Sequence, residues 1–263
     1  MSLTDDRHRG GRALSTHLGL HLEPSRAEGT VTGTAAHRPD LSRPDGSLRT
    51  GVLATLLDSV GGLVTGLAVL PDWVVTADLS VRTWAPSRGA RVHGDARLLR
   101  RGRSTAIGEV LLHDGDPAAP IGAGVLTSGV LTPDFPLPEE IGEVMVPAHL
   151  PEPDGGHVAL PEWLGVVDRP DGAELAVSPR LLNPWGMVHG GVSAMLVDLA
   201  VEATTGHLVD DLLLRYLRPG RVGPIRATVT QLGPRTVRAV VADEGADGRV
   251  VAQAVVGLGA EIS

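Results

Sequence analysis

The chain contains one segment twice. An eight-residue stretch beginning at Gly51 aligns without a gap on the stretch beginning at Gly191, 140 positions further along. The register continues upstream, where three residues coincide in the two copies: Leu41 with Leu181, Pro44 with Pro184, and Gly46 with Gly186. Self-similarity at a fixed spacing indicates two structural units of the same kind. With 263 residues in total, each half has the length of an ordinary small domain.

The two copies differ in their polar residues. Three positions of the first copy, Arg43, Arg49 and Thr50, correspond to Asn183, His189 and Gly190 in the second. A repeat in which one copy keeps a set of polar groups and the other replaces it predicts duplication followed by loss of one of two sites.

Each half shows the same order of predicted elements: a short strand and a glycine turn, a long helix, and four strands. The apolar spacing predicts helices over residues 51–68 and 191–207. The predicted strands of the first half are 74–84, 90–99, 104–113 and 122–131, and those of the second are 212–217, 225–231, 236–242 and 250–257. Short turns between consecutive strands favour antiparallel pairing, so we expect an α+β fold in which an antiparallel sheet wraps around each helix.

Residues 132–157 lie between the halves and contain six prolines and several acids, which predicts an extended surface linker. The first predicted helix is apolar and long enough to cross a membrane, with Asp58 as its only charge. Its counterpart in the second copy carries Asp198, Glu202 and His207, so the shared feature is a buried helix with one acid and we expect no membrane span.

Charge and composition exclude several classes of function. A net charge of −8 argues against nucleic-acid binding, because neutralising phosphates requires a basic excess. The absence of cysteine excludes disulfides and thiolate metal sites, and the ten histidines show no metal-ligand spacing. We therefore expect no metal and no cofactor. The first 12 residues lack the apolar stretch of a secretory signal, so we expect a soluble, cytoplasmic protein.

An acid lies in the middle of both apolar helices, at Asp58 and Asp198. Burying an unpaired charge costs several kcal/mol, so such a residue has either a structural partner or a chemical purpose. The structural alternative is an acid that caps a neighbouring chain end or faces a water pocket. Gly190 and Gly191 begin the second helix, where free backbone N–H groups and the helix dipole favour an oxyanion, although a tight turn needs the same residues.

Together these residues resemble a known signature. The pattern Asn183-x-x-Gly186-x-x-His189-Gly190-Gly191, followed by Asp198, is similar to that of hotdog-fold acyl-CoA thioesterases of the phenylacetyl-CoA (PaaI-like) type. The strand segment 75–81, Trp84-Ala85-Pro86 and Arg101-Gly102-Arg103 also resemble that family. The resemblance implies a tandem double hotdog, with hotdog domains at 13–131 and 158–263, a linker at 132–157, and one continuous sheet as in a pseudo-dimer. It also implies a homodimer of such chains.

In that family the site lies between two hotdogs, and the resemblance implies a composite site in this chain. Asp58 would be the general base or the nucleophile, Thr76 would bind Asp58 or the attacking species, and Asn183 would orient water or carbonyl. The N–H of Gly190 would polarise the thioester carbonyl. His189 would chiefly fix the loop, Gly191 would contact substrate, and Trp185 would line the acyl pocket or pack on the linker. The second site, with Arg43, Thr50, Asp198 and Val209, would be degenerate.

The resemblance leaves the carrier open between coenzyme A and acyl carrier protein. Two groups of arginines could meet the phosphates of coenzyme A: Arg97, Arg100, Arg101 and Arg103, or Arg215, Arg218 and Arg221. Two other functions compete with hydrolysis. One is non-catalytic acyl-CoA binding, because a fold does not guarantee activity. The other is enoyl-CoA hydration, which needs an Asp and a His close together before the helix, and Asp45 has no such His.

Overall fold

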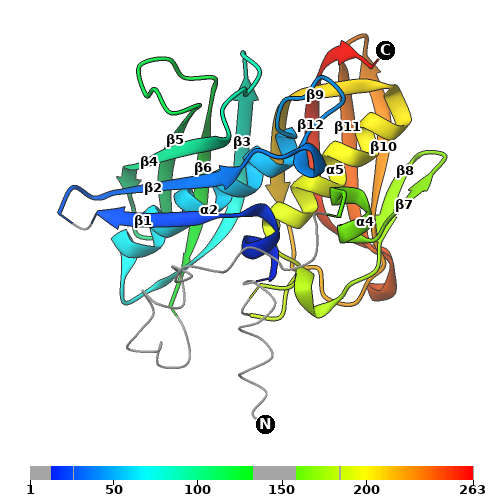
Figure 1. Ribbon diagram of the computed structural model, residues 1–263. Coiled ribbons are helices and arrows are strands. Elements are labelled where there is room, and N and C mark those ends of the chain that lie inside the picture. Colours follow the sequence, from blue (N-terminus) through cyan, green and yellow to red (C-terminus); the bar gives the residue numbers. More distant parts are fainter. Residues whose placement is uncertain (1–12, 26, 133–157, 184, 263) are drawn as a thin grey trace.

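A computed structural model of the chain describes residues 13–25, 27–132, 158–183 and 185–262. Among these residues, twelve strands form one antiparallel sheet in the order β1-β2-β4-β5-β6-β3-β9-β12-β11-β10-β8-β7 (Figure 1). The first half supplies β1 (His21–Ser25), β2 (Thr30–Ala36), β3 (Trp73–Thr83), β4 (Arg91–Arg101), β5 (Thr105–His113) and β6 (Gly122–Leu131). The second half supplies β7 (Val166–Arg169), β8 (Gly172–Leu175), β9 (His207–Tyr216), β10 (Ile225–Gly233), β11 (Thr236–Asp243) and β12 (Arg249–Glu261).

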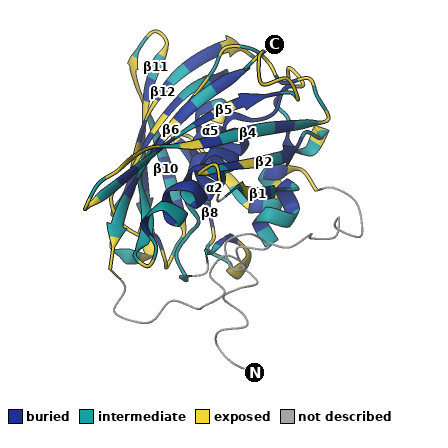
Figure 2. Cartoon of the chain, turned by 90° about the vertical axis from the view of Figure 1, so that its left-hand side faces the viewer, coloured by how far each residue is buried: buried dark blue, intermediate teal, exposed yellow. Residues whose placement is uncertain are grey.

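Two long helices, α2 (Thr50–Val69) and α5 (Gly190–Thr205), are enclosed by the sheet. Sixteen of the twenty residues of α2 are buried, and Figure 2 shows both helices dark blue inside the surrounding strands. A helix that is apolar on all sides must be covered on all sides, and here the sheet and the other helix cover it. Residues 13–18 are also helical, and the other short helical elements are α4 (Leu160–Leu164), η1 (Pro39–Leu41), η2 (Pro179–Leu181) and η3 (Glu244–Ala246).

Helix α2 has the length and hydropathy of a membrane span, with a mean hydropathy of 1.8. In the structure, however, 72% of its apolar stretch is buried inside the molecule. Helix α2 is therefore buried in the way that a core helix of a folded domain is buried.

The two halves join edge to edge. Strand β3 pairs with β9 in an antiparallel register that sets Asp78 opposite Arg215 and Arg82 opposite Asp211. The two helices pack closely against each other in their N-terminal halves. A Cβ on Gly51 would lie only 2.6 Å from the Cα of Met195. At the symmetry-related position, a Cβ on Gly191 would lie 2.4 Å from the Thr55 side chain. Both glycines are therefore required for the close helix approach.

The chain is thus α+β with a double-hotdog architecture and one continuous sheet, as the sequence predicts. One predicted feature differs in number: each long helix is preceded by two paired strands, β1–β2 and β7–β8, rather than by one short strand. The other predicted helices and strands differ from the observed ones mainly at their ends: β9 begins at His207 rather than 212, and α5 ends at Thr205 rather than 207. The short helix α4 was not predicted, because its five residues are too few for a periodic pattern. Of the predicted linker at 132–157, residues 133–157 lie outside the described residues.

Candidate active site between the two halves

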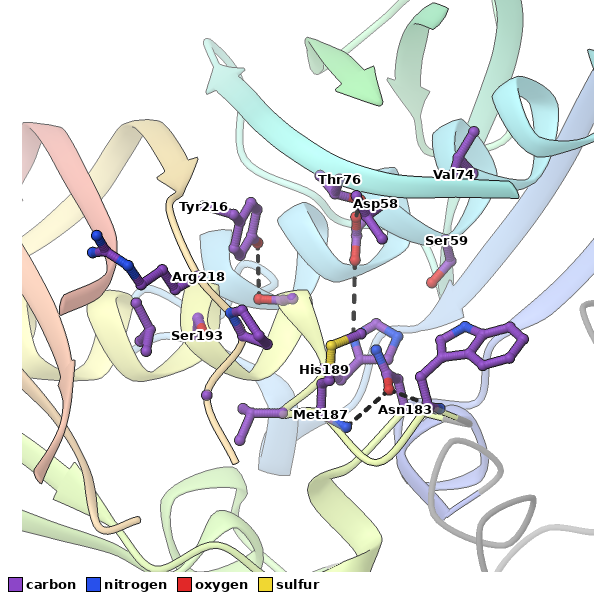
Figure 3. A pocket seen from close by; sticks show the side chains of 18 of the residues that line it. Asp58, Ser59, Val74, Thr76, Asn183, Met187, His189, Ser193, Tyr216 and Arg218 are labelled. Atoms are coloured by element: carbon purple, nitrogen blue, oxygen red, sulfur yellow. Dashed lines mark hydrogen bonds and ion pairs between the residues drawn. The ribbon is translucent and has the colours of Figure 1, made fainter. Parts of the chain in front are cut away.

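A cavity of about 600 Å³ lies between the two halves, and both halves contribute to its lining. Asp58 and Thr76 come from the first half, while Asn183, His189 and Gly190 come from the second. Figure 3 shows Thr76 and Asp58 on one side of this cavity, with His189 and Asn183 facing them. The structure therefore brings together the five residues to which the sequence analysis assigns catalytic roles, although they span more than half of the chain.

Asp58 lies on α2 with 9% of its surface exposed. The hydroxyl of Thr76 donates a hydrogen bond of 2.7 Å to Asp58 Oδ1. A β-bulge in β3 between Thr76 and Asp78 shifts the register against β6 at this point, and bulges commonly re-aim a side chain next to a site. Asp58 Oδ2 has no hydrogen-bond donor among the described residues, and it lies 3.8 Å from His189 Nδ1. One carboxylate oxygen is thus held in place while the other faces the cavity.

The loop before α5 is built around the Asn183 side chain. Asn183 Oδ1 accepts hydrogen bonds from the backbone N–H groups of Trp185 (3.0 Å) and Met187 (3.1 Å). Gly186 has a φ of 71°, a left-handed conformation that favours glycine. Because Oδ1 is occupied by the turn, the Nδ2 donor is the part of the Asn183 amide available to a molecule in the cavity.

Helix α5 begins at Gly190, and His189 is its N-cap residue. The Gly191 N–H donates a 3.0 Å hydrogen bond to His189 Nδ1. For the Gly190 N–H there is no hydrogen-bond acceptor among the residues that the structure describes. Burial lowers the pKa of His189, and the nearby Asp58 carboxylate counteracts part of that shift. His189 is therefore neutral, and since Nδ1 accepts from Gly191, its proton resides on Nε2.

Tyr216, at the end of β9, also belongs to the site and was not foreseen from the sequence. Its hydroxyl donates a 2.9 Å hydrogen bond to the Gly190 carbonyl oxygen. Burial, and secondarily the Asp58 carboxylate, raise the pKa of Tyr216 well above its ordinary value, so the hydroxyl remains a donor. The repeat gave no signal, because alignment on the Trp84 and Leu217 segments sets Thr83 opposite Tyr216.

Gly190 has little space for a side chain. A Cβ at this position would lie 3.0 Å from Asp58 Oδ2 and 3.1 Å from the Tyr216 hydroxyl. Gly191 differs from its predicted role of contacting substrate: it is buried against Thr55, its N–H is used by His189, and it does not line the cavity.

Trp185 lines one end of the cavity together with Trp73. The two rings meet edge to face, with centroids 4.6 Å apart and an angle of 73° between their planes. Leu63, Val74 and Leu131 also line the cavity, and Leu131 pairs with Trp73 across the β3–β6 ladder. Of the arginines proposed for phosphate contact, Arg218 lines the cavity on the Tyr216 side (Figure 3), whereas Arg97 and Arg215 form ion pairs with Glu109 and Asp78.

At the corresponding place of the first copy, protein groups satisfy one another. Asp198 is 1% exposed, and its Oδ2 accepts the Gly51 N–H at 3.0 Å. The Thr50 hydroxyl and the Arg43 guanidinium both donate to the Val209 carbonyl oxygen. Burial raises the pKa of Asp198, partly offset by Arg49 and the Gly51 N–H.

Arg49, which stands where the second copy has His189, forms an ion pair with Glu202. Arginine side chains and their partners therefore occupy the region that corresponds to the composite site. Within the described part of the chain, no group of three His, Cys, Asp or Glu residues is arranged to hold a metal ion.

No protein-family model and no curated protein sequence matches this chain. Solved structures do. An acyl-ACP thioesterase from Bacteroides thetaiotaomicron is similar with a TM-score of 0.62 at 15% identity, covering 90% of this chain and 100% of the other. A 12:0-ACP thioesterase from Umbellularia californica is similar with a TM-score of 0.59 at 16% identity, covering 88% and 97%. The chain therefore shares its double-hotdog fold with these two structures over nearly its whole described length.

Proposed function

We propose that the chain hydrolyses acyl thioesters at one composite site between its two halves. The observation that carries this proposal is the different use of the two buried acids. Asp198 Oδ2 is bound by the Gly51 N–H. At the composite site, His189 Nδ1 accepts the equivalent Gly191 N–H, which leaves Asp58 Oδ2 facing the cavity. Among the described residues, this buried carboxylate oxygen has no donor and the neighbouring Gly190 N–H has no acceptor, an arrangement suited to activating a nucleophile beside an oxyanion.

The proposed reaction uses these groups in order. The thioester carbonyl oxygen accepts hydrogen bonds from the Gly190 N–H and from Asn183 Nδ2, which stabilises negative charge as it develops on that oxygen. Asp58 takes a proton from water, and the water oxygen adds to the carbonyl carbon. The C–S bond then breaks and the thiolate receives the proton that Asp58 took from water, which yields a free acid and a thiol. Alternatively, Asp58 attacks the carbonyl carbon directly and expels the thiolate, and water then hydrolyses the resulting anhydride; this route uses the same placement.

The two ends of the cavity differ in chemistry and suggest how a thioester lies in it. We propose that the acyl group lies at the end lined by Trp73 and Trp185, where apolar and aromatic side chains dominate. The thiol carrier then extends past Tyr216 toward Arg218, an exposed cation on the cavity wall. We propose coenzyme A as the carrier, as in enzymes of the phenylacetyl-CoA type. The acyl-ACP thioesterases with the same fold make acyl carrier protein the competing carrier.

The test is thiol release from a panel of phenylacetyl, medium-chain and long-chain thioesters, each presented on coenzyme A and on acyl carrier protein. A thiol-reactive dye is suitable because the chain has no cysteine of its own. We expect Asp58→Asn to lower turnover by about a hundredfold or more, the size of effect typical for loss of one catalytic group. Asp198→Asn is the matched control from the other copy, and we expect it to retain turnover within about threefold.

Each outcome decides between the candidate functions. Equal loss in both variants, or loss only in Asp198→Asn, would contradict a single site that uses Asp58. Saturable acyl-CoA binding without thiol release from any member of the panel would replace hydrolysis by non-catalytic binding. Turnover of the carrier-protein thioesters alone would keep the hydrolase and change its carrier.

A further inference from the structure

Helix α5 starts with two glycines in succession, Gly190 and Gly191. Glycine loses more conformational freedom on folding than any other residue, so a Gly-Gly pair makes a loose first turn. The proposed oxyanion donor, the Gly190 N–H, belongs to this turn. Preorganised donors stabilise a transition state because they need no reorientation during the reaction, so any looseness here would weaken catalysis.

Contacts from two different elements hold the peptide unit between the two glycines. On one side, the Tyr216 hydroxyl donates to the Gly190 carbonyl oxygen at 2.9 Å. On the other side, the Gly191 N–H of the same peptide unit donates to His189 Nδ1 at 3.0 Å. The peptide plane is thus bound at both of its polar atoms, which fixes ψ of Gly190 and φ of Gly191. In Figure 3 a dashed line marks the hydrogen bond made by the Tyr216 hydroxyl.

The first copy of the repeat provides an internal comparison. Its helix begins with Thr50, which corresponds to Gly190 but carries a side chain. The Thr50 hydroxyl donates to the Val209 carbonyl oxygen. The residue that corresponds to Tyr216 is Thr83, and its hydroxyl donates to the Asp210 carbonyl oxygen at 3.3 Å instead of to the helix. The copy whose helix begins with Thr50 therefore has no tyrosine at this strand position, whereas the copy whose helix begins with Gly190 has Tyr216.

The packing explains why the tyrosine and the glycine occur together. A Cβ on Gly190 would approach the Tyr216 hydroxyl oxygen to 3.1 Å and its Cζ to 3.2 Å. The tyrosine ring therefore fills the space that a side chain at position 190 would take, and it supplies the restraint that this side chain would have given.

From this geometry we propose that Tyr216 is a positioning residue, which clamps the Gly190–Gly191 peptide so that the Gly190 N–H stays directed at the substrate carbonyl. This role rests on the proposed hydrolase function. The clamp itself is a property of the folded chain, so it can be measured without substrate.

The test compares Tyr216→Phe with Thr83→Val. The first variant keeps the ring and loses the hydroxyl, and the second loses the corresponding hydroxyl of the other half. For Tyr216→Phe we expect kcat to fall about tenfold with KM changed less than twofold, because the donor acts on the transition state rather than on ground-state binding. We also expect amide hydrogen exchange at Gly191, followed by NMR, to accelerate about tenfold or more. Thr83→Val should change neither quantity.

The two readouts separate failure of the clamp from failure of the proposed function. Wild-type kcat together with unchanged Gly191 exchange in Tyr216→Phe would overturn the clamp. An equal loss of kcat in Thr83→Val would also overturn it, because a general packing effect would then explain both variants. If the wild-type protein released no thiol from any thioester, the proposed hydrolase function would be wrong. Gly191 amide exchange in Tyr216→Phe would then test the clamp alone: faster exchange than in the wild type would support it, and unchanged exchange would contradict it.

Discussion

At the residue scale, the same acid has opposite surroundings in the two copies of the repeat. Asp198 accepts a hydrogen bond from the Gly51 N–H and has almost no exposed surface. In the other copy, His189 accepts the corresponding Gly191 N–H, and Asp58 accepts a hydrogen bond from the Thr76 hydroxyl. The N-cap residue differs in the same way: it is Arg49 in the first copy, with no side-chain cap hydrogen bond, and His189 in the second, whose side chain accepts the Gly191 N–H. A neutral imidazole nitrogen can take over the role of a carboxylate oxygen, while a guanidinium cannot.

Tyr216 offers a direct measurement of the electrostatics of the site, because it is the one tyrosine in the sequence. Its pKa is raised by burial first and by the Asp58 carboxylate second. In an alkaline absorbance titration, we therefore expect no phenolate near pH ~10, where an exposed tyrosine ionises. Asp58→Asn removes a negative charge beside the hydroxyl, so the pKa of Tyr216 should fall in that variant.

The raised pKa of Tyr216 also makes the stability of the fold depend on pH. The unfolded chain loses its tyrosine proton first, so the contribution of Tyr216 to stability is full below the unfolded pKa and is lost as pH rises through the folded pKa. Circular dichroism at each pH separates ionisation from unfolding. A phenolate signal near pH ~10 from protein that is still folded would contradict the buried position of this hydroxyl.

Part of the candidate site could be predicted from the residues, and the rest only from the resemblance to a known family. Asp58 stands out as an acid in a repeated apolar helix, and Asn183 as a residue that differs from Arg43 in the first copy, whereas the role of Thr76 came from the resemblance. Tyr216 could not be found in this way, since a lone tyrosine at a strand end has no periodic pattern and the corresponding residue of the other copy, Thr83, is not a tyrosine. Gly191 was assigned to substrate because adjacent glycines at a helix start look alike in sequence, and only packing shows which one is buried against Thr55.

At the element scale, the long helices and central strands were predictable because each is long, apolar and present twice. The edge hairpin β7–β8 and helix α4 have only four or five residues each, too few for a period to emerge, and tertiary contacts decide their structure. The antiparallel order of strands followed from the short turns. The close crossing of α2 and α5 did not, since it depends on which helix face each glycine occupies.

Helix α2 has two adjacent glycines that should respond in opposite ways to the same substitution. A Cβ on Gly62 would meet no atom within 4 Å, whereas a Cβ on Gly61 would lie 3.3 Å from Leu126 Cβ. We expect Gly62→Ala to raise the free energy of unfolding by about 0.5–1 kcal/mol, because alanine reduces the entropy lost on forming the helix. Gly61→Ala gains the same entropy but must displace Leu126, so it should be less stable than Gly62→Ala by about 1 kcal/mol or more.

Urea denaturation of both variants measures these differences, and the free energies should be compared at equal m-values. A lower free energy of unfolding for Gly62→Ala than for the wild type would show that this side of α2 is more closely packed than the structure indicates.

At the scale of the whole molecule, two similar halves form one sheet and one helix pair, but the two related sites differ. Within the described residues, the composite site at Asp58 faces a cavity, whereas the groups around Asp198 bind one another. The halves are joined by β3–β9 pairing and by the contact of α2 with α5. Charged pairs also cross between them. Arg49 with Glu202 links the helices at the filled site, and Arg82 with Asp211 links the central strands on the outer face. These pairs differ in burial, which predicts different contributions to stability.

The side chains of Arg49 and Glu202 are 10% and 19% exposed, whereas those of Arg82 and Asp211 are 72% and 37% exposed. Arg49→Ala should lower the free energy of unfolding by about 2–4 kcal/mol, because it removes the ion-pair partner of Glu202 and the arginine that acts most strongly on the buried Asp198. Arg82→Ala removes another ion pair between the halves. It should lower the free energy of unfolding by less than about 1 kcal/mol, since exposed ion pairs are screened by water.

The pH dependence gives a second test of the same pair. Arg49 holds down the pKa of Asp198, which burial raises. Without Arg49 that pKa rises further, so the carboxylate is tolerated less as pH increases, and the loss of stability should be larger at pH ~8 than at pH ~4. Urea denaturation at both pH values measures this. A loss that is equal at the two pH values, or no greater than that of Arg82→Ala, would mean that the arginines of the filled site do not hold the halves together. The first copy would then have lost its site without gaining a structural role.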